Sequence, residues 1–292
     1  MPGMTDEERE RRRMENLQLI QDARLMDDPF MTRAFQDDIE CGQLLATLMT
    51  GRNDITVTKV IAQHELPNLR GRSVRLDIHA FDHDRRDIDI EIQRAKKGAS
   101  PKRIRYNSGM MDSNFLVKRE DFDDLPEQYI FFITEKDVTG LHQLITPVER
   151  RMGPNWSLPF QDGIHIAYID SSKADDSPLG KLMHDFRCRR ADEMYYPLLR
   201  ERVRYYKETD KGVTIMSDLF EEIRTRDREE GKAEGMAEGK AEGKAEGKAE
   251  GEGNIVLNML KGHMHLDVIE KLSGWTADNI RALAQKNGLA VE

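Results

Sequence analysis

Apolar and polar residues alternate in two neighbouring stretches of the chain, residues 74–80 and 88–92. The apolar positions are Val74, Leu76, Ile78 and Ala80 in the first stretch and Ile88, Ile90 and Ile92 in the second. A period of two is typical of a strand that buries one face. Because only three residues separate Asp82 from Arg86, we predict that the two strands form an antiparallel hairpin with a short loop at residues 83–85.

The polar faces of these two strands carry acidic residues. If Asp82 pairs with Arg86, the same register places Asp77 opposite Glu91. Side chains directly opposed on one face have Cβ atoms about 5 Å apart, and two carboxylates that close repel unless one is protonated or a cation lies between them. A hard divalent ion such as Mg²⁺ would relieve the repulsion. The alternative is an ordinary solvated hairpin face, although like charges placed opposite each other destabilise a strand pair.

Comparable patterns predict the other elements. A charged helix is expected at residues 5–25; Pro29 suits a first helical position, and Asp37 or Asp38 can cap a helix that runs through Met49 and ends at Gly51. Further strands are expected at 55–66, 128–134, 144–148 and 163–170, and further helices at 101–115, 178–187 and 191–207. A sheet with helices before, within and after it indicates an α/β fold with its elements in a mixed order.

The composition adds solvated extensions to this core. Charged residues make up 34% and apolar residues 38% of the 292 residues, which is typical of a core with exposed helices attached. No apolar run approaches the roughly 20 residues of a membrane-spanning helix, and the N-terminus has no apolar signal region, so we expect a cytoplasmic protein without a membrane partner. Cys41 and Cys188 lack metal-site or disulfide spacing and are expected to pack in the core.

The net charge of −9 disfavours attraction of DNA by the molecule as a whole. Positive charge is nevertheless concentrated just after the second strand of the hairpin. Six basic residues fall there within twelve positions: Arg94, Lys96, Lys97, Lys102, Arg103 and Arg105. Such a cluster can bind DNA phosphates without reading sequence. The alternative is the solvated start of a helix.

Residues 231–251 read GKAEGMAEGKAEGKAEGKAEG, a four-residue repeat. A period of four advances about 40° past each helical turn, so no face stays apolar. Like charges stand four residues apart, and each glycine costs about 1 kcal/mol relative to alanine in a helix interior. We therefore expect at most a marginal, fraying helix that serves as a linker at residues 231–253.

Helical periodicity returns in residues 254–292, with one helix from Ile255, a second from Leu266 and a third capped by Thr276. Three short helices in fewer than about 40 residues rarely fold alone, so we expect this segment to dock or to self-associate. A helix-turn-helix-like DNA contact is the alternative, although the basic content of the segment is low.

Five blocks of sequence carry a family resemblance. In order they are DDPFMTRAF, GRSVRLD, EIQRA, RIRYNS and LMHDFRCRRADEMYY. Together with Asp77 on one strand, Glu91 and Gln93 on the next and Glu40 on a preceding helix, they resemble the PD-(D/E)XK nuclease superfamily. More narrowly, roughly residues 25–230 resemble the recombination-promoting nuclease/putative transposase family. The superfamily usually has lysine at the position of Gln93, so this chain departs from the general pattern but not from that of the narrower family.

The resemblance implies a restriction-endonuclease-like α/β fold, with a mixed central sheet flanked by helices, over residues 27–230. A charged N-terminal helix at 1–26 precedes it. It also implies a metal-dependent DNA endonuclease, a hydrolase acting in DNA recombination. Mg²⁺, with Mn²⁺ as a substitute, would be held by Asp77, Glu91 and Glu40, and DNA would contact the basic cluster and Tyr106. The sequence has no GxSxG elbow, P-loop or HExxH helix that would support another chemistry. The alternative is a nuclease fold with weak or no catalysis that acts as a binding or assembly module through its repeat and C-terminal helices.

Gln93 would then occupy the place of the usual lysine, beside the attacking water. A neutral amide can accept a hydrogen bond from that water and orient it, but it offers no charge to stabilise hydroxide. Arg103 on the basic helix is the expected source of the missing charge, with Tyr106 about one turn further along the same face. The alternative is that Gln93 only satisfies hydrogen bonds on the sheet face.

Overall fold

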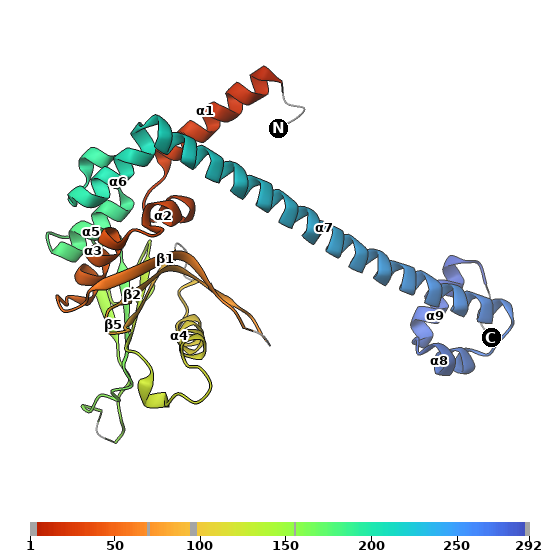
Figure 1. Ribbon diagram of the computed structural model, residues 1–292. Helices are drawn as coiled ribbons and strands as arrows, with labels where there is room; N and C mark the ends of the chain where they lie inside the picture. The colour runs from red at the N-terminus through yellow and green to blue at the C-terminus, as the bar shows by residue number, and fades with distance from the viewer. Residues whose placement is uncertain (1–4, 69–70, 94–97, 155, 290–292) are drawn as a thin grey trace. The chain divides into compact units, whose positions relative to one another are not determined.

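The computed structural model describes residues 5–68, 71–93, 98–154 and 156–289, and the chain forms two compact units, Met1–Glu221 and Glu222–Glu292. The first unit is built on a six-stranded sheet (Figure 1). Its strands are β1 (Val57–Leu66), β2 (Val74–Asp82), β3 (Asp87–Gln93), β4 (Gln128–Thr134), β5 (Ile145–Val148) and β6 (Ile164–Asp170). Their order across the sheet is β1-β2-β3-β4-β6-β5.

The sheet is mixed, as the sequence predicts. Strands β1, β2 and β3 form an antiparallel meander, β3, β4 and β6 run parallel, and β5 is antiparallel to β6 at the edge. Pro147 lies in β5, where an edge strand tolerates the missing N–H. The predicted α/β class with a mixed sheet is therefore confirmed.

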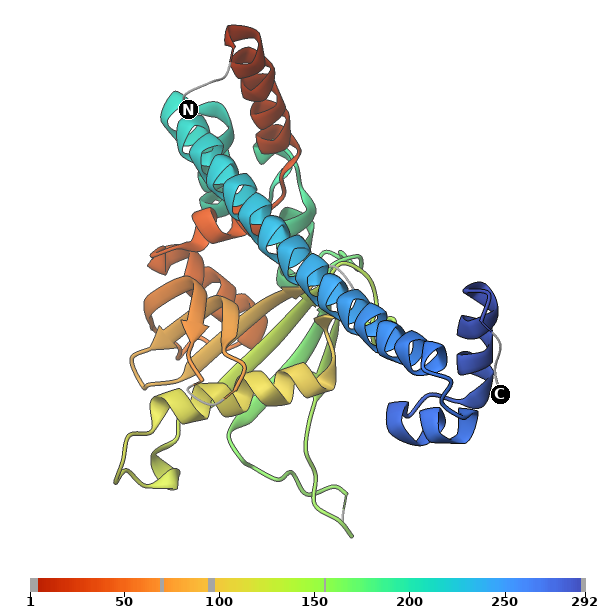
Figure 2. The ribbon, with the colours of Figure 1, turned by 90° about the vertical axis from the view of Figure 1, so that its right-hand side faces the viewer.

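Helices cover both faces of this sheet. One face carries α2 (Asp28–Phe35), α3 (Ile39–Thr50), α5 (Pro178–Arg187) and α6 (Pro197–Glu208). The other face carries α4 (Pro101–Phe115), which lies across the sheet in Figure 2. Alternate side chains of β4 serve the two cores: Phe131 and Ile133 pack with the first group of helices, and Ile130 and Phe132 pack with α4. This double burial explains why β4 is apolar along nearly its whole length.

Local signals set the helix bounds. Asp38 caps α3 by accepting a hydrogen bond from the Cys41 N–H at 2.9 Å, and Gly51 ends the helix with φ at 68°. The predicted start of the helix at residue 191 is wrong. A short 3-10 turn at Ala191–Glu193 comes first, and α6 begins at Pro197, because proline is suited to a first helical turn and not to a helix interior.

The charged N-terminal helix, α1 (Asp6–Asp22), belongs to the first unit. Most of its side chains are exposed, but Ile20 is buried and joins the same core as Leu25. Lys207 of α6 holds the segment that follows α1, because its Nζ donates a hydrogen bond to the carbonyl of Ala23 at 2.6 Å.

The long helix α7 (Asp210–Lys261) runs through the whole repeat, so the repeat is helical, and the marginal, fraying character expected of this helix stays a prediction. Lysine, alanine and glutamate fill most positions of the repeat, and all three are strong helix formers. The flanking segments are already helical, so the repeat extends an existing helix and does not bear the cost of nucleation. A Cβ added at any of six repeat glycines would meet no atom within 4 Å: Gly231, Gly235, Gly239, Gly243, Gly247 and Gly251.

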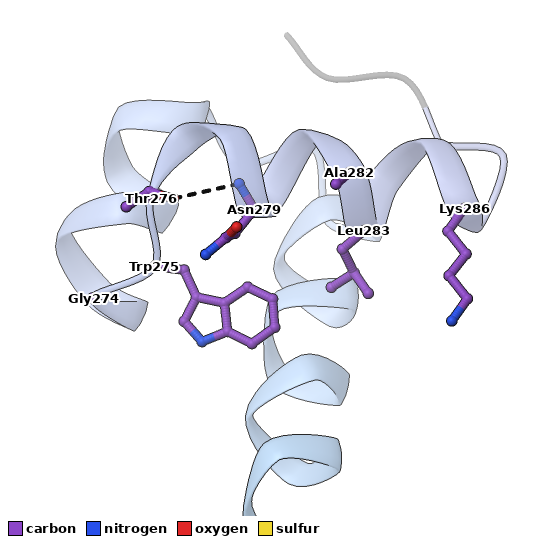
Figure 3. A pocket seen from close by; sticks show the side chains of 7 residues that line it. All are labelled: Gly274, Trp275, Thr276, Asn279, Ala282, Leu283 and Lys286. Carbon is purple, nitrogen blue, oxygen red and sulfur yellow. Dashed lines mark hydrogen bonds between the residues drawn. The ribbon is translucent and has the colours of Figure 1, made fainter.

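The end of α7 packs with α8 (Leu266–Ser273) and α9 (Ala277–Lys286) around a small separate core. That core comprises Val256, Leu260, Ile269, Ile280 and Ala284. Thr276 caps α9 by accepting a hydrogen bond from the Asn279 N–H at 3.4 Å (Figure 3), so the predicted capped third helix is confirmed. Trp275 borders a shallow pocket of about 430 Å³ beside this cap.

Within the described residues, no helix has both the length and the apolar content needed to cross a membrane.

Candidate functional site

The predicted register of the β2–β3 hairpin is confirmed. Ile78 pairs with Ile90, and the N–H of Asp82 donates to the carbonyl of Arg86 at 3.1 Å. The ladder between the two strands stops at Ile78, so the predicted pairing of Asp77 with Glu91 is not part of it. The next residue towards the start of β2 is Asp77, which is therefore released from regular strand pairing with β3.

Strand β2 changes faces beside Asp77. Ile78 packs in the core that contains α2 and α3, whereas Leu76 packs in the core on the α4 side. Regular alternation would place both side chains on one face. On the neighbouring strand β1, Gln63 has φ at 53° and lies between the residues that pair with Ile78 and Leu76. A left-handed residue is uncommon within a strand, and here it marks the irregularity at which Asp77 is presented.

The Asp77 carboxylate binds a main-chain group where the regular ladder is lost. Its Oδ2 accepts a hydrogen bond from the Ile92 N–H at 2.8 Å, and its Oδ1 accepts one from Nε2 of Gln63 at 3.3 Å. The same Gln63 nitrogen donates to Oδ1 of Asp28 at 2.8 Å. Asp28 opens α2, so a carboxylate from a helix is bridged to Asp77 through one amide.

Glu91 lies on β3 with its side chain fully buried. Its Oε1 accepts a hydrogen bond from Nδ2 of Asn107 at 3.1 Å, and its Oε2 accepts one from Nε2 of Gln93 at 3.2 Å. The guanidinium of Arg103 forms an ion pair with the same Oε2. Both Arg103 and Asn107 come from α4, four residues apart and hence on one helix face.

The electrostatics of Asp77 and Glu91 reflect burial and proximity. Burial raises the pKa of Asp77 to about 6, against the opposing effect of its hydrogen bond from the Ile92 N–H. Burial and the negative charge of Asp77 raise the pKa of Glu91 to about 8, while Arg103 acts in the opposite direction on both. Two carboxylates that disfavour ionisation together are suited to binding a cation.

Asp89 extends this acidic strand face away from the pocket. The side chain is fully buried, and its Oδ2 accepts only a long hydrogen bond from Nδ2 of Asn107, at 3.4 Å. Its Oδ1 has no hydrogen-bond partner within the described part of the chain. Burial and the neighbouring Glu91 raise the pKa of Asp89 well above its usual range, as expected for a carboxyl group that water cannot reach.

A pair of histidines, of which His79 is buried and His64 half-buried, continues the polar face towards the hairpin loop. Nε2 of His79 is paired with Oδ1 of Asp87, and its Nδ1 lies 2.7 Å from Nδ1 of His64. Burial and the neighbouring His79 lower the pKa of His64. Since Asp87 can only accept from His79, the consistent arrangement has His64 donating to His79 and His79 donating to Asp87.

An open pocket of about 1130 Å³ lies between the ends of β1 and β2 and the first half of α4. Six predicted site residues line it: Asp77, Gln93, Lys102, Arg103, Arg105 and Tyr106. Glu91 does not line the pocket but contacts two residues that do, Gln93 and Arg103. The predicted DNA-binding residues Arg94, Lys96 and Lys97 lie outside the described residues.

Glu40 is the predicted site residue that the structure does not bring to this group. It is exposed on the first turn of α3, and among the described residues no hydrogen bond or ion pair joins it to Asp77 or Glu91. The helical carboxylate bridged to Asp77 is Asp28. Helical periodicity predicts only the face of α3 on which Glu40 lies. The distance from a helical carboxylate to Asp77 depends instead on which helix packs beside the strand irregularity.

Sequence reasoning missed other members of the site. Asn107 carried a usable signal, because it lies four residues after Arg103 and must share its helix face. The sequence pattern singles out neither Asp28 nor the two arginines Arg72 and Arg75, which also line the pocket. Their convergence depends on the irregularity at Gln63, which no alternation pattern predicts.

A second group of potential metal ligands lies elsewhere, at His184, Asp185 and Cys188. Both Asp185 oxygens already accept main-chain hydrogen bonds, from the N–H groups of Tyr195 and Tyr196 at 2.8 Å each. Burial raises the pKa of the Cys188 thiol to about 11, so the thiol is protonated near neutral pH. We assign this cluster to anchoring the start of α6, and the predicted packing role of Cys41 and Cys188 is confirmed by their burial.

The arrangement around Asp77 therefore combines buried carboxylates with a cation-lined opening, which suits a hard metal ion and a phosphate. Comparison of the chain with protein-family models, with curated proteins and with solved structures gives no match. Any function assigned to the chain thus rests on the chemistry of this site and on the resemblance carried by its sequence blocks.

Proposed function

We propose that the protein is a Mg²⁺-dependent DNA endonuclease of the recombination-promoting nuclease/putative transposase type, which hydrolyses phosphodiester bonds. The observation that carries the proposal is the convergence of Asp77 and Glu91 from neighbouring strands next to a pocket lined by cations. The carboxylates provide oxygen ligands for a divalent ion, and the cations provide contacts for a polyanion. The family resemblance of residues 25–230 supports the same assignment.

The residues present fit a hard divalent ion. The donor atoms are carboxylate oxygens, which Mg²⁺ and Mn²⁺ prefer. The raised pKa values of Asp77 and Glu91 mean that the positive charge around them is too small to stabilise both carboxylates in the ionised form. Asp77 and Glu91 would hold the ion, with Asp28 in place of Glu40 as the nearest helical carboxylate. When bound, such an ion neutralises phosphate charge and promotes ionisation of water.

Arg103 and Gln93 both contact Glu91 and have separate roles in this proposal. Arg103 neutralises Glu91 in the structure, so a divalent ion would compete with Arg103 for that carboxylate. An Arg103 side chain released from Glu91 would then be available to the scissile phosphate, since a guanidinium matches phosphate geometry. Gln93 donates to Glu91, which assigns it at least the task of fixing that carboxylate; its proposed contact with water stays a prediction.

One observation favours a second function. Glu91 is fully buried and already paired with Arg103, so the fold has an internal way to neutralise its acidic strand without a metal. A chain that keeps this pairing would bind DNA through its cations and would not cleave it. Metal-dependent chemistry distinguishes the two functions.

The decisive experiment is nicking of supercoiled plasmid by the full chain in Mg²⁺, Mn²⁺ or EDTA. We expect cleavage in both metals and none in EDTA, with a loss of at least roughly 100-fold in Asp77→Asn and in Glu91→Gln. Asp28→Asn should lose about tenfold, as a supporting ligand would, and Glu40→Gln should cleave as the parent does. Equal cleavage by the parent and Asp77→Asn would refute the proposal in favour of the binding function.

A further inference from the structure

The pocket beside Asp77 has two basic walls. Arg72 and Arg75 stand on the wall formed by the start of β2, and Lys102 and Arg105 stand on the wall formed by α4. In the described part of the chain no carboxylate forms an ion pair with any of these four side chains. Their number is unusual in a molecule of net charge −9, and unneutralised cations facing one opening attract an extended anion. Glu65 and Asp77 are the acidic residues among the pocket lining.

Arginines elsewhere in the first unit show the contrast. Arg86, near the hairpin loop, forms ion pairs with Asp54, Asp82 and Asp84 at 3.0 to 3.1 Å. It therefore has no charge to offer a ligand. The four pocket cations differ from Arg86 in having no acidic partner among the described residues. Other described cations such as Lys118 share this lack, and what sets the four apart is that they line one opening.

An aromatic side chain lies between the two walls. Tyr106 of α4 lines the pocket and keeps 39% of its surface exposed. Its hydroxyl group donates a hydrogen bond to the main-chain carbonyl of Arg72 and accepts one from Nδ2 of Asn68 at 3.2 Å. Because both polar interactions of the hydroxyl are satisfied internally, the surface left to a ligand is that of the aromatic ring.

The same contacts fix the distance between the walls. Besides the Tyr106 hydrogen bonds, Nδ2 of Asn114 donates to the carbonyl of Pro67 at 3.5 Å, and Leu66 shares a buried core with Met110 of α4. The end of the β1–β2 pair therefore rests on α4 along several turns. Widening the pocket would break these contacts together.

We infer that this pocket binds a single strand of DNA, with its phosphates on the four cations and one unpaired base stacked on Tyr106. The inference rests on the proposed function and names its substrate class: single-stranded or locally unpaired DNA in preference to a continuous duplex. A base in a duplex has both faces stacked on its neighbours, so it cannot also cover an aromatic side chain without being extruded. Stacking on an aromatic ring beside a basic groove is the usual mode of single-strand binding.

Binding is tested in EDTA, so that no cleavage is needed for a result. Fluorescence anisotropy of the full chain would compare one labelled sequence as a single strand, as a perfect duplex and as a duplex with a two-nucleotide bulge. We expect the single strand and the bulged duplex to bind about tenfold more tightly than the perfect duplex. Tyr106→Leu should lose about tenfold on the single strand, whereas Tyr106→Phe, which keeps the ring, should stay within about threefold of the parent.

Matched controls separate stacking and charge from general effects. Phe122→Leu removes an aromatic ring that is 81% exposed outside the pocket and should change nothing. Arg75→Gln and Arg105→Gln should each lower the slope of log affinity against log salt by about 0.7 on a single strand, whereas Lys173→Gln, an exposed cation outside the pocket, should not.

The outcomes test the single-strand inference and the proposed nuclease function separately. Equal or tighter binding of the perfect duplex, parental binding by Tyr106→Leu, or loss of binding by Tyr106→Phe would overturn the single-strand inference. Metal-dependent cleavage without a preference for unpaired DNA would overturn the inference and leave the proposed function intact. Single-strand preference without cleavage in Mg²⁺ or Mn²⁺ would overturn the proposed function and leave the single-strand inference intact.

Discussion

Glu91 carries its carboxylate where water does not reach it, and this gives the site a pH dependence. Its pKa of about 8 and the pKa of about 6 for Asp77 both lie above the values of an unfolded chain, which are near 4. The folded state therefore binds more protons than the unfolded state between about pH 4 and pH 8. The stabilising contribution of the protonated groups is fully present below pH 4 and is lost as the pH rises through 6 and then 8.

Substituting Glu91→Gln removes this titration while keeping the shape of the side chain. Relative to the parent, we expect the free energy of unfolding of Glu91→Gln to increase as the pH rises from 5 to 8, measured by urea denaturation in EDTA. Glu65→Gln supplies the control, because it makes the same chemical change at an exposed residue of the pocket. A constant difference between Glu91→Gln and the parent at all pH values would mean that Glu91 ionises normally. Added Mg²⁺ should stabilise the parent most at pH 8, where the carboxylates are ionised.

Among elements, the β2–β3 hairpin was predictable and the site built on it only partly so. Alternation and a three-residue loop sufficed for the register, because both are local properties of the chain. The change of face between Leu76 and Ile78 was not predictable, since it depends on the left-handed conformation of Gln63 on another strand. For the same reason the sequence placed Glu40 in the site, whereas the packing of α2 brings Asp28 there.

The helical conformation of the repeat in α7 depends on the helical segments that flank it, which local penalties leave out. Its glycines are unfavourable in isolation, and the added Cβ atom of an alanine would meet nothing at Gly239 or Gly243. We expect the double substitution of these two glycines by alanine to stabilise the repeat by about 1 kcal/mol per site, measured as slower amide hydrogen exchange across residues 231–253. Gly212→Ala in the same helix is the contrasting variant. Its Cβ would lie 2.0 Å from the Tyr205 carbonyl oxygen, so it should destabilise. Unchanged exchange in the double variant would show that glycine is not what limits helix stability in the repeat.

At the scale of the whole molecule, the two units have separate cores, and every described residue that lines the pocket belongs to the first. The charged residues also differ between the two parts. Four cations that line the pocket have no ion-pair partner among the described residues, whereas the repeat alternates lysine and glutamate in its sequence. The first unit should therefore hold the metal and the DNA without help from the repeat or the C-terminal helices. Self-association through α8 and α9 stays a prediction of their small core and exposed Val268 and Leu272.

A chain ended after Arg228 tests this division. It keeps Met216 and Phe220, the contacts by which the start of α7 packs on the first core, and it loses the repeat and all of the second unit after Arg228. We expect its Tm to lie within about 3 °C of the corresponding transition of the full chain, because little buried surface of the first unit is removed. We also expect its single-strand affinity in EDTA to be unchanged.

Limited proteolysis of the full chain should cut first between Gly231 and Gly253, where the described side chains are mostly exposed and the helix can open locally. A fall in Tm of more than about 10 °C would mean that the second unit is needed to stabilise the first. Equal resistance of the repeat and the core to protease would mean that packing against a partner orders the repeat.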